Sequence, residues 1–165
     1  MRIFLLIFVL FSGCAYTMGY GHFPDQIKKL AVPPVTEDGV DIDAAALLGG
    51  AIRRAVTRHP SADLVSVPKA DARLQITLLD VSGSLAPMAD PGLRAAQYRA
   101  RVTMKAVLIH RDGRTLWRTS RIIGQADYLS VPDDIEALEG RHKTALKEAS
   151  DSAAEQLMTA LVYQR

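Results

Sequence analysis

This chain of 165 residues has one cysteine, little net charge and no apolar run long enough to cross a bilayer. The lone Cys14 excludes an internal disulfide and a metal site built on several thiolates. A balance of 20 basic against 18 acidic side chains argues against nucleic acid as a default partner. The apolar run at residues 3–11 is far shorter than the roughly 20 residues that span a membrane.

The short apolar run is instead typical of an export signal. It follows the positive charge of Arg2 and ends in Ser-Gly-Cys14, which resembles a lipobox, with Phe11 where leucine is usual. We therefore predict a signal peptide over residues 1–13 and lipidation of Cys14. Ala15, in place of the aspartate that retains lipoproteins on the inner membrane, favours the outer membrane, facing the periplasm. The alternative is a buried first strand with an inert thiol.

Removal of the signal leaves 152 residues, enough for one domain and too few for two. The glycine-rich, aperiodic residues 14–26 predict a lipidated tether, and residues 27–165 a single domain.

Alternation and helical periodicity predict an element order of β, α, β, β, β, β, α. The fold class that follows is an α/β (α+β) two-layer sandwich, with a mixed or antiparallel sheet of about four to five strands and two helices on one face. An Asp-Gly pair predicts a hairpin between the last two strands. The alternation of the strand after this pair changes phase, which predicts a bulge. Residues 82–92 are predicted to form an exposed loop. The predicted strands are 27–33, 63–67, 72–78, 97–109 and 115–128, and the predicted helices are 44–59 and 135–162.

Charges are segregated along the chain. Residues 94–121 hold eight basic side chains and one acid, whereas residues 127–155 hold eight acids and three bases. Alternation places several cations on the sheet face that the helices leave open, where they would present donors to phosphate at a repeat of roughly 6.6–6.8 Å. The alternative is a solvated face, or charges that protect an edge. The phosphate-binding candidates are Arg99, Arg101 and Lys105, with Arg73, Arg118 and Arg121 as neighbours.

The sequence gives little support for an enzyme, and we expect no catalytic residue, metal or cofactor. Its four histidines are far apart, and it has no Gly-x-Ser-x-Gly, P-loop or Gly-x-Gly-x-x-Gly motif. His142 reads as a residue at a helix–sheet border. Asp133 and Asp134 read as the start of a helix, where acids are favoured. Tyr98 and Trp117 are expected in the core or at an interface.

Several segments together resemble the LptE family of lipopolysaccharide-assembly lipoproteins. They are Cys14-Ala-Tyr, residues 27–34 (IKKLAVPP), 69–78 (KADARLQITL), 98–108 (YRARVTMKAVL) and 112–117 (DGRTLW). Family members commonly begin Cys-Gly-Tyr, so Ala15 departs from the pattern. The resemblance implies an outer-membrane lipoprotein that plugs an LptD-type β-barrel, helps that barrel fold and assists lipopolysaccharide delivery. Because lipid A carries phosphates, the six candidate cations become the candidates for binding lipopolysaccharide.

Two other functions remain open at this stage. An auxiliary lipoprotein of another envelope transporter, such as a phospholipid-type ABC system, would share the anchor and an α/β domain but need a different partner. A small periplasmic hydrolase would need a catalytic constellation that the sequence lacks. The lipid anchor makes the membrane a partner both in the LptE-like role and in the role of an auxiliary transporter lipoprotein.

Overall fold

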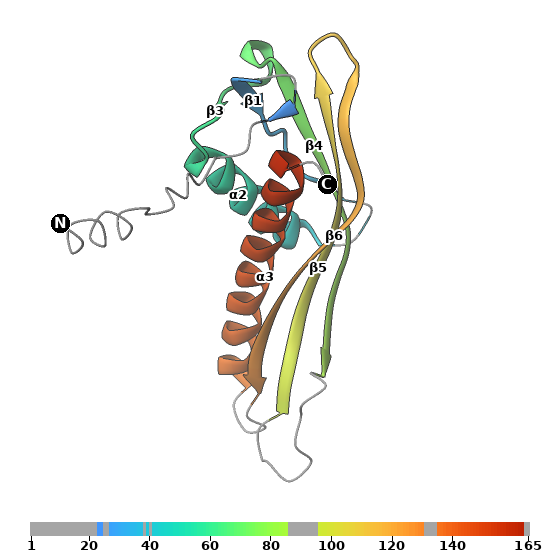
Figure 1. Ribbon diagram of the computed structural model, residues 1–165. Coiled ribbons are helices and arrows are strands. Elements are labelled where there is room, and N and C mark those ends of the chain that lie inside the picture. Colours follow the sequence, from blue (N-terminus) through green and yellow to red (C-terminus); the bar gives the residue numbers. More distant parts are fainter. Residues whose placement is uncertain are drawn as a thin grey trace, which may run out of the picture.

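The computed structural model describes residues 23–24, 27–37, 39, 41–85, 96–130 and 135–163. The signal segment and Cys14 lie outside the described residues, as do Asp133 and Asp134. Figure 1 shows two helices on one side of a long, twisted sheet. This two-layer arrangement, with a mixed sheet and both helices on one face, confirms the predicted fold class.

The first helix, α2 (Ile42–Arg58), begins at Asp41, whose side chain accepts hydrogen bonds from the backbone N–H groups of Asp43 and Ala44. A carboxylate at this position satisfies N–H groups that have no partner within the helix. One stripe of the helix is buried, with Leu48, Ile52 and Val56 fully enclosed. The helix thus covers the sheet with the apolar stripe that its sequence predicts.

Three long antiparallel strands form most of the sheet: β4 (Ala72–Leu85), β5 (Ala96–His110) and β6 (Thr115–Ser130). The short strands β1 (Lys29–Ala31), β2 (Thr36–Glu37) and β3 (Asp63–Leu64) add to the β4 side with parallel pairing. The order is β3-β1-β4-β5-β6, with β2 also beside β4, so β6 lies at one edge. The sheet is mixed because α2 lies in the chain between β1 and β2 on one side and β3 and β4 on the other, which lets these strands pair in parallel.

The hairpin between β5 and β6 forms at the predicted Asp-Gly pair. The N–H of Gly113 donates to the carbonyl of His110 at 2.9 Å, and Gly113 has a φ of 94°, which favours glycine. Two register irregularities follow, between Met104 and Ala106 and between Leu108 and Ile109 as counted on β5. The phase break in the sequence of β6 therefore corresponds to bulges, as predicted.

The core lies between the sheet and the helices. The even-numbered residues of β5 from Ala100 to Leu108 are all fully buried, while their odd-numbered neighbours face the other side. The second long helix, α3 (Ile135–Tyr163), covers β5 and β6 and contributes Ala149, Leu157 and Leu161 to the core. Half-buried Trp117 packs against this core, as expected, and half-buried Tyr98 stacks on Tyr128, which also packs against the core.

Helix α3 approaches β6 most closely at Gly124. A Cβ atom at this glycine would lie 1.9 Å from the carbonyl oxygen of Ala149 and 2.6 Å from the amide nitrogen of Ala153. No larger residue fits there without moving helix backbone, so this glycine fixes how the helix sits on the strand.

Three details differ from the sequence-based expectations. Residues 82–85, predicted as loop, belong to β4, and Thr36–Glu37, which lie in no predicted strand or helix, form β2. The rest of the predicted loop, residues 86–92, lies outside the described residues. Phe23, expected in the tether, is 3% exposed and packs edge-on against His59. Packed structure therefore extends to the N-terminal side of Ile27.

Candidate functional site

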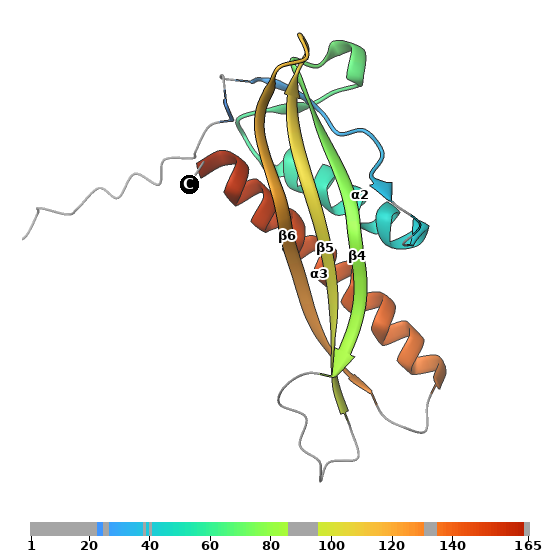
Figure 2. The same ribbon diagram turned by 90° about the vertical axis from the view of Figure 1, so that its right-hand side faces the viewer.

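The candidate site is the sheet face that points away from the helices, which we call the outer face. Figure 2 looks onto this face, with β4, β5 and β6 side by side and both helices behind them. No described element covers it. The outer face presents the odd-numbered side chains of β5, flanked on β4 and β6 by the residues paired with them.

Five of the six predicted cations share the outer face without an acidic partner among the described residues. Lys105 is central, with Arg121 in the bulge opposite it, and Arg118 lies one pair further toward the hairpin. We call this set the basic face: Arg73, Arg101, Lys105, Arg118 and Arg121. All are exposed except half-buried Arg101. On strands, such residues recur about every 6.8 Å, which suits a ligand with several anionic groups.

Arg101 has an unsatisfied donor. Its Nε atom is buried and has no hydrogen-bond partner. Leaving a buried polar group unpaired costs roughly 1–3 kcal/mol, and more for a charged group. An anionic oxygen on the outer face would supply the missing acceptor.

The sixth cation, Arg99, already has a partner. Its Nε and Nη2 atoms donate to the two carboxylate oxygens of Asp127 at 2.6 and 2.9 Å. This fork-like hydrogen bonding raises the pKa of Arg99 and lowers the pKa of Asp127. The structure therefore separates Arg99 from the five unpaired cations, although binding at any of the six stays a prediction.

Acidic side chains on the outer face are few. In the described part of the three long strands, Asp80 is the other acid there, paired across from Thr103. The acids of the C-terminal region lie mainly on α3, where Glu139, Glu148 and Glu155 are exposed. The outer face is therefore mainly basic, whereas the helix layer carries both signs, with Arg54 and Lys143 among its exposed bases.

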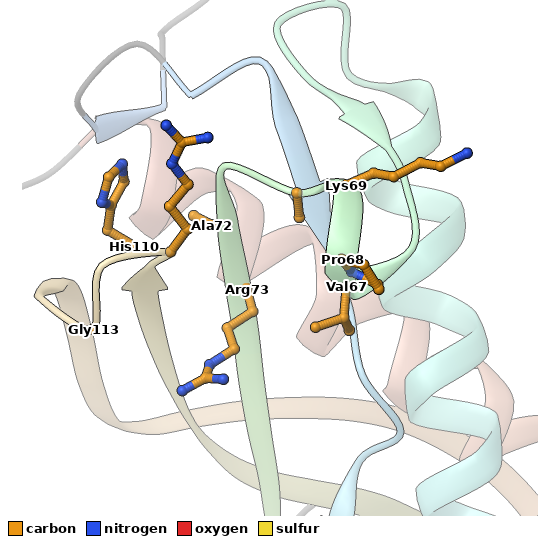
Figure 3. A pocket seen from close by; sticks show the side chains of 9 residues that line it. Val67, Pro68, Lys69, Ala72, Arg73, His110 and Gly113 are labelled. Carbon is orange, nitrogen blue, oxygen red and sulfur yellow. The ribbon is translucent and has the colours of Figure 1, made fainter.

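A pocket of about 330 Å³ lies beside the basic face, between the hairpin and the short 3-10 helix η3 (Val67–Lys69). Lys69, Arg73 and His110 line it. Figure 3 shows the charged ends of Lys69 and Arg73 pointing in opposite directions. These cations do not converge on one small ligand, so the pocket itself is a weaker candidate than the strand surface.

Two features on the α3 side of β6 were not identified as a site from the sequence. Tyr128 stacks on Tyr98 at 5.7 Å between ring centroids and contacts His142 at 5.5 Å, which confirms His142 as a helix–sheet border residue. Burial raises the pKa of Tyr128. Beside this cluster, half-buried Arg141 has two buried nitrogens, Nε and Nη2, without partners. Strand alternation could have placed the two tyrosines on the helix-facing side of the sheet. No pattern in the sequence indicates that Arg141 would have buried nitrogens without partners.

The described residues hold no cluster of three or more potential metal ligands. Within the same residues, no helix combines the length and the apolar character needed to cross a membrane.

Comparisons with known proteins show the fold and the family of the chain. Among the solved structures that the chain resembles is a Xanthomonas campestris protein, with 13% identity and a TM-score of 0.53 over 87% of this chain and 91% of that one. A minor lipoprotein from Acinetobacter baumannii has 12% identity and a TM-score of 0.52 over 84% of this chain and 92% of that one. Rare lipoprotein B from Shewanella oneidensis has 16% identity and a TM-score of 0.51 over 83% of this chain and 96% of that one. At these identities the likeness establishes the fold alone. No curated protein matches. A family model described as LptE, lipopolysaccharide-assembly, matches residues 27–161, so the chain belongs to the LptE family.

Proposed function

We propose that this protein is an outer-membrane lipoprotein that acts as an accessory subunit in lipopolysaccharide assembly. In this role it plugs an LptD-type β-barrel, helps the barrel fold and contacts lipopolysaccharide through its basic face. Family membership supports the assembly role, and the family is one of non-enzymatic accessory lipoproteins associated with the outer membrane. Lipidation of Cys14 after cleavage of residues 1–13 would hold the domain at the membrane, facing the periplasm.

The observation that carries the lipopolysaccharide contact is the set of unpaired cations on an open sheet face. Lipid A bears phosphates, and guanidinium and ammonium groups donate charge-assisted hydrogen bonds to phosphate oxygens. A cation already held by a carboxylate would have to give up that partner, whereas Lys105, Arg118 and Arg121 have no such partner to lose among the described residues. The buried Nε of Arg101 adds a donor in need of an acceptor.

The direct test is binding of purified lipopolysaccharide to the wild-type protein and to the double variant Lys105→Glu, Arg118→Glu. Losing two charge-assisted contacts should weaken binding by tenfold or more, since about 1.4 kcal/mol corresponds to a factor of ten. The matched control is Lys143→Glu, Lys147→Glu, which reverses two exposed charges on the helix layer. Equal binding by all three proteins would refute the basic face as the contact.

The partner is tested by purifying the tagged protein from detergent-solubilised outer membranes. We expect a large β-barrel to copurify. An inner-membrane transporter in its place would favour the alternative, an auxiliary lipoprotein of a phospholipid-type ABC system.

The anchor is tested by mass spectrometry of the mature N-terminus. An acylated Cys14 is expected, and an unmodified thiol would remove the membrane anchor from the proposal.

A further inference from the structure

The free edge of β6 carries a groove that the proposed lipopolysaccharide contact does not use. It lies between residues 127–129 of β6 and residues 137–148 of α3 and has a volume of about 470 Å³. We call it the edge groove. Its helix side is lined by small residues, among them Gly140, Thr144 and Ala145, together with Arg141.

The strand side of the edge groove has outward-facing backbone groups with which no described strand pairs. The β5–β6 register runs without a break from Ile122 to Ser130. The side chain of Gln156 donates to the carbonyl of Ile123 at 2.9 Å from the α3 side, so this carbonyl points away from β5. N–H and C=O groups alternate in direction along an antiparallel strand. The groups of Gln125, Asp127 and Leu129 therefore also point outward, where no described strand pairs with them.

This part of the edge lacks the usual protection against strand addition. Natural edges are blunted by bulges, prolines or unpaired charges. Residues 122–130 contain no proline and no register shift, and the charge of Asp127 is held by Arg99. Leu129 is 55% exposed. An extended polypeptide can therefore lie beside this segment and pair with it.

Arg141 indicates the chemistry of the occupant. Its buried, unpaired Nε and Nη2 atoms lie on the helix that walls the edge groove. In an added strand, alternate side chains would enter the groove, where the small helix residues leave room for them. A carboxylate among those side chains would satisfy Arg141. Glu148, seven residues further along α3 and about 10 Å away, gives the other end of the groove the opposite charge.

We propose that the edge groove binds an extended segment of the partner barrel by β-strand addition, with an acidic side chain of that segment opposite Arg141. The proposal rests on the proposed function, which supplies the barrel, and it names the contact surface. A lipid acyl chain would fill the volume but would leave the backbone groups of Gln125, Asp127 and Leu129 unpaired. Strand addition satisfies both the backbone and Arg141.

The test uses the complex of this protein with the LptD-type barrel of the same bacterium, purified from outer membranes. Residue-resolved hydrogen exchange compares the complex with the free protein. We expect slowed exchange at the amides of Gln125, Asp127 and Leu129, with little change at Ala126 and Tyr128, whose amides already face β5. An added strand is expected to give this alternation, because its hydrogen bonds reach only the outward-facing amides of β6.

Two variants test the groove itself. Arg141→Glu reverses the charge. Gly140→Leu puts a side chain into the groove that Gly140 lines, where its Cβ atom would meet nothing within 4 Å. Each should reduce the recovered barrel at least tenfold, while Lys143→Glu, an exposed charge reversal on the same helix, should not. Circular dichroism confirms that each variant is folded.

The outcomes separate this proposal from the proposed function. If the barrel copurifies but the three edge amides exchange as in the free protein, or if both groove variants keep the barrel, strand addition is wrong and the function stands. Slowed exchange caused by lipopolysaccharide vesicles or by self-association of the free protein would also overturn it. If the wild-type protein recovers no barrel, the proposed function fails and this proposal fails with it.

Discussion

The two halves of the seam between β6 and α3 differ in how closely the helix approaches the strand. In one half, formed by α3 from Ala149 onward, Gly124 lets the backbone of α3 sit directly on the strand, and the side chain of Gln156 donates to the backbone carbonyl of Ile123 at the edge. In the other half, formed by the first turns of α3, Tyr128 occupies the same helix-facing side of β6, stacks on Tyr98 and contacts His142. The edge groove lies in this second half, between β6 and α3.

The strand residue that faces α3 sets how closely the helix approaches the edge. Small residues on the helix are present in both halves, at Ala149 and Ala153 in the first and at Gly140 and Ala145 in the second. What differs is the strand residue that faces them, because Gly124 has no side chain and Tyr128 has an aromatic ring. We call the half at Gly124 the closed half and the half at Tyr128 the open half.

The largest effect is expected from filling the closed half. Gly124→Ala would place a methyl group 1.9 Å from the carbonyl oxygen of Ala149, so α3 would have to move. We expect the free energy of unfolding in urea to fall by about 3 kcal/mol or more. The matched control is Gly83→Ala on β4, whose nearest new contact is 3.8 Å away. Equal stability of the two variants would contradict close packing at Gly124.

In the open half, the aromatic pair should couple energetically. A double-mutant cycle with Tyr98→Ala and Tyr128→Ala should give a coupling free energy of about 1 kcal/mol, since their rings stack at 5.7 Å. Urea unfolding of the four proteins measures it. Additive effects of the two single substitutions would mean that the two rings contribute independently to stability and that stacking on Tyr98 does not hold Tyr128 in place.

A methyl group added on the helix side of the open half should stabilise the protein. Gly140→Ala meets no atom within 4 Å and replaces glycine inside a helix, which is worth about 0.5–1 kcal/mol. The urea midpoint should therefore rise, opposite in sign to Gly124→Ala. A fall would show that the groove is closed in solution.

The smallest effect concerns acid. Hydrogen bonding from Arg99 lowers the pKa of Asp127 in the folded protein, so the pair stabilises the fold above the unfolded value of about 3.9. This contribution is lost as pH falls below 4 through the folded pKa. The urea midpoint of the wild type should exceed that of Asp127→Asn at pH 6, and the difference between the two midpoints should shrink as the pH is lowered below 4. A gap independent of pH would argue against the ion pair.

Much of the outer face could be predicted from the sequence, because side chains alternate with a period of two along a strand. Alternation alone placed Arg99, Arg101 and Lys105 together and opposite the core. It could not show that Arg99 is paired, since cross-strand partners depend on the register. Each bulge shifts the register by one residue, and the two bulges in the hairpin bring Asp127 rather than Gln125 opposite Arg99.

Other features depend on contacts that no local pattern encodes. Strand β2 has only two residues, and Thr36 is held by pairing with Thr77 on β4, far along the chain. The close packing at Gly124 could be predicted only by knowing which turn of α3 crosses this residue. Arg141 reads as an ordinary helix cation, and its unpaired nitrogens emerge only from the packing around it.

The central claim, that the outer face contacts lipopolysaccharide, is tested most directly by photo-crosslinking in cells. A photoreactive residue replacing Lys105, at the centre of the basic face, should yield an adduct that carries lipopolysaccharide. The same residue replacing Lys147, exposed on the helix layer, should yield little or none. No lipopolysaccharide adduct at position 105, or equal adducts at both positions, would contradict the account.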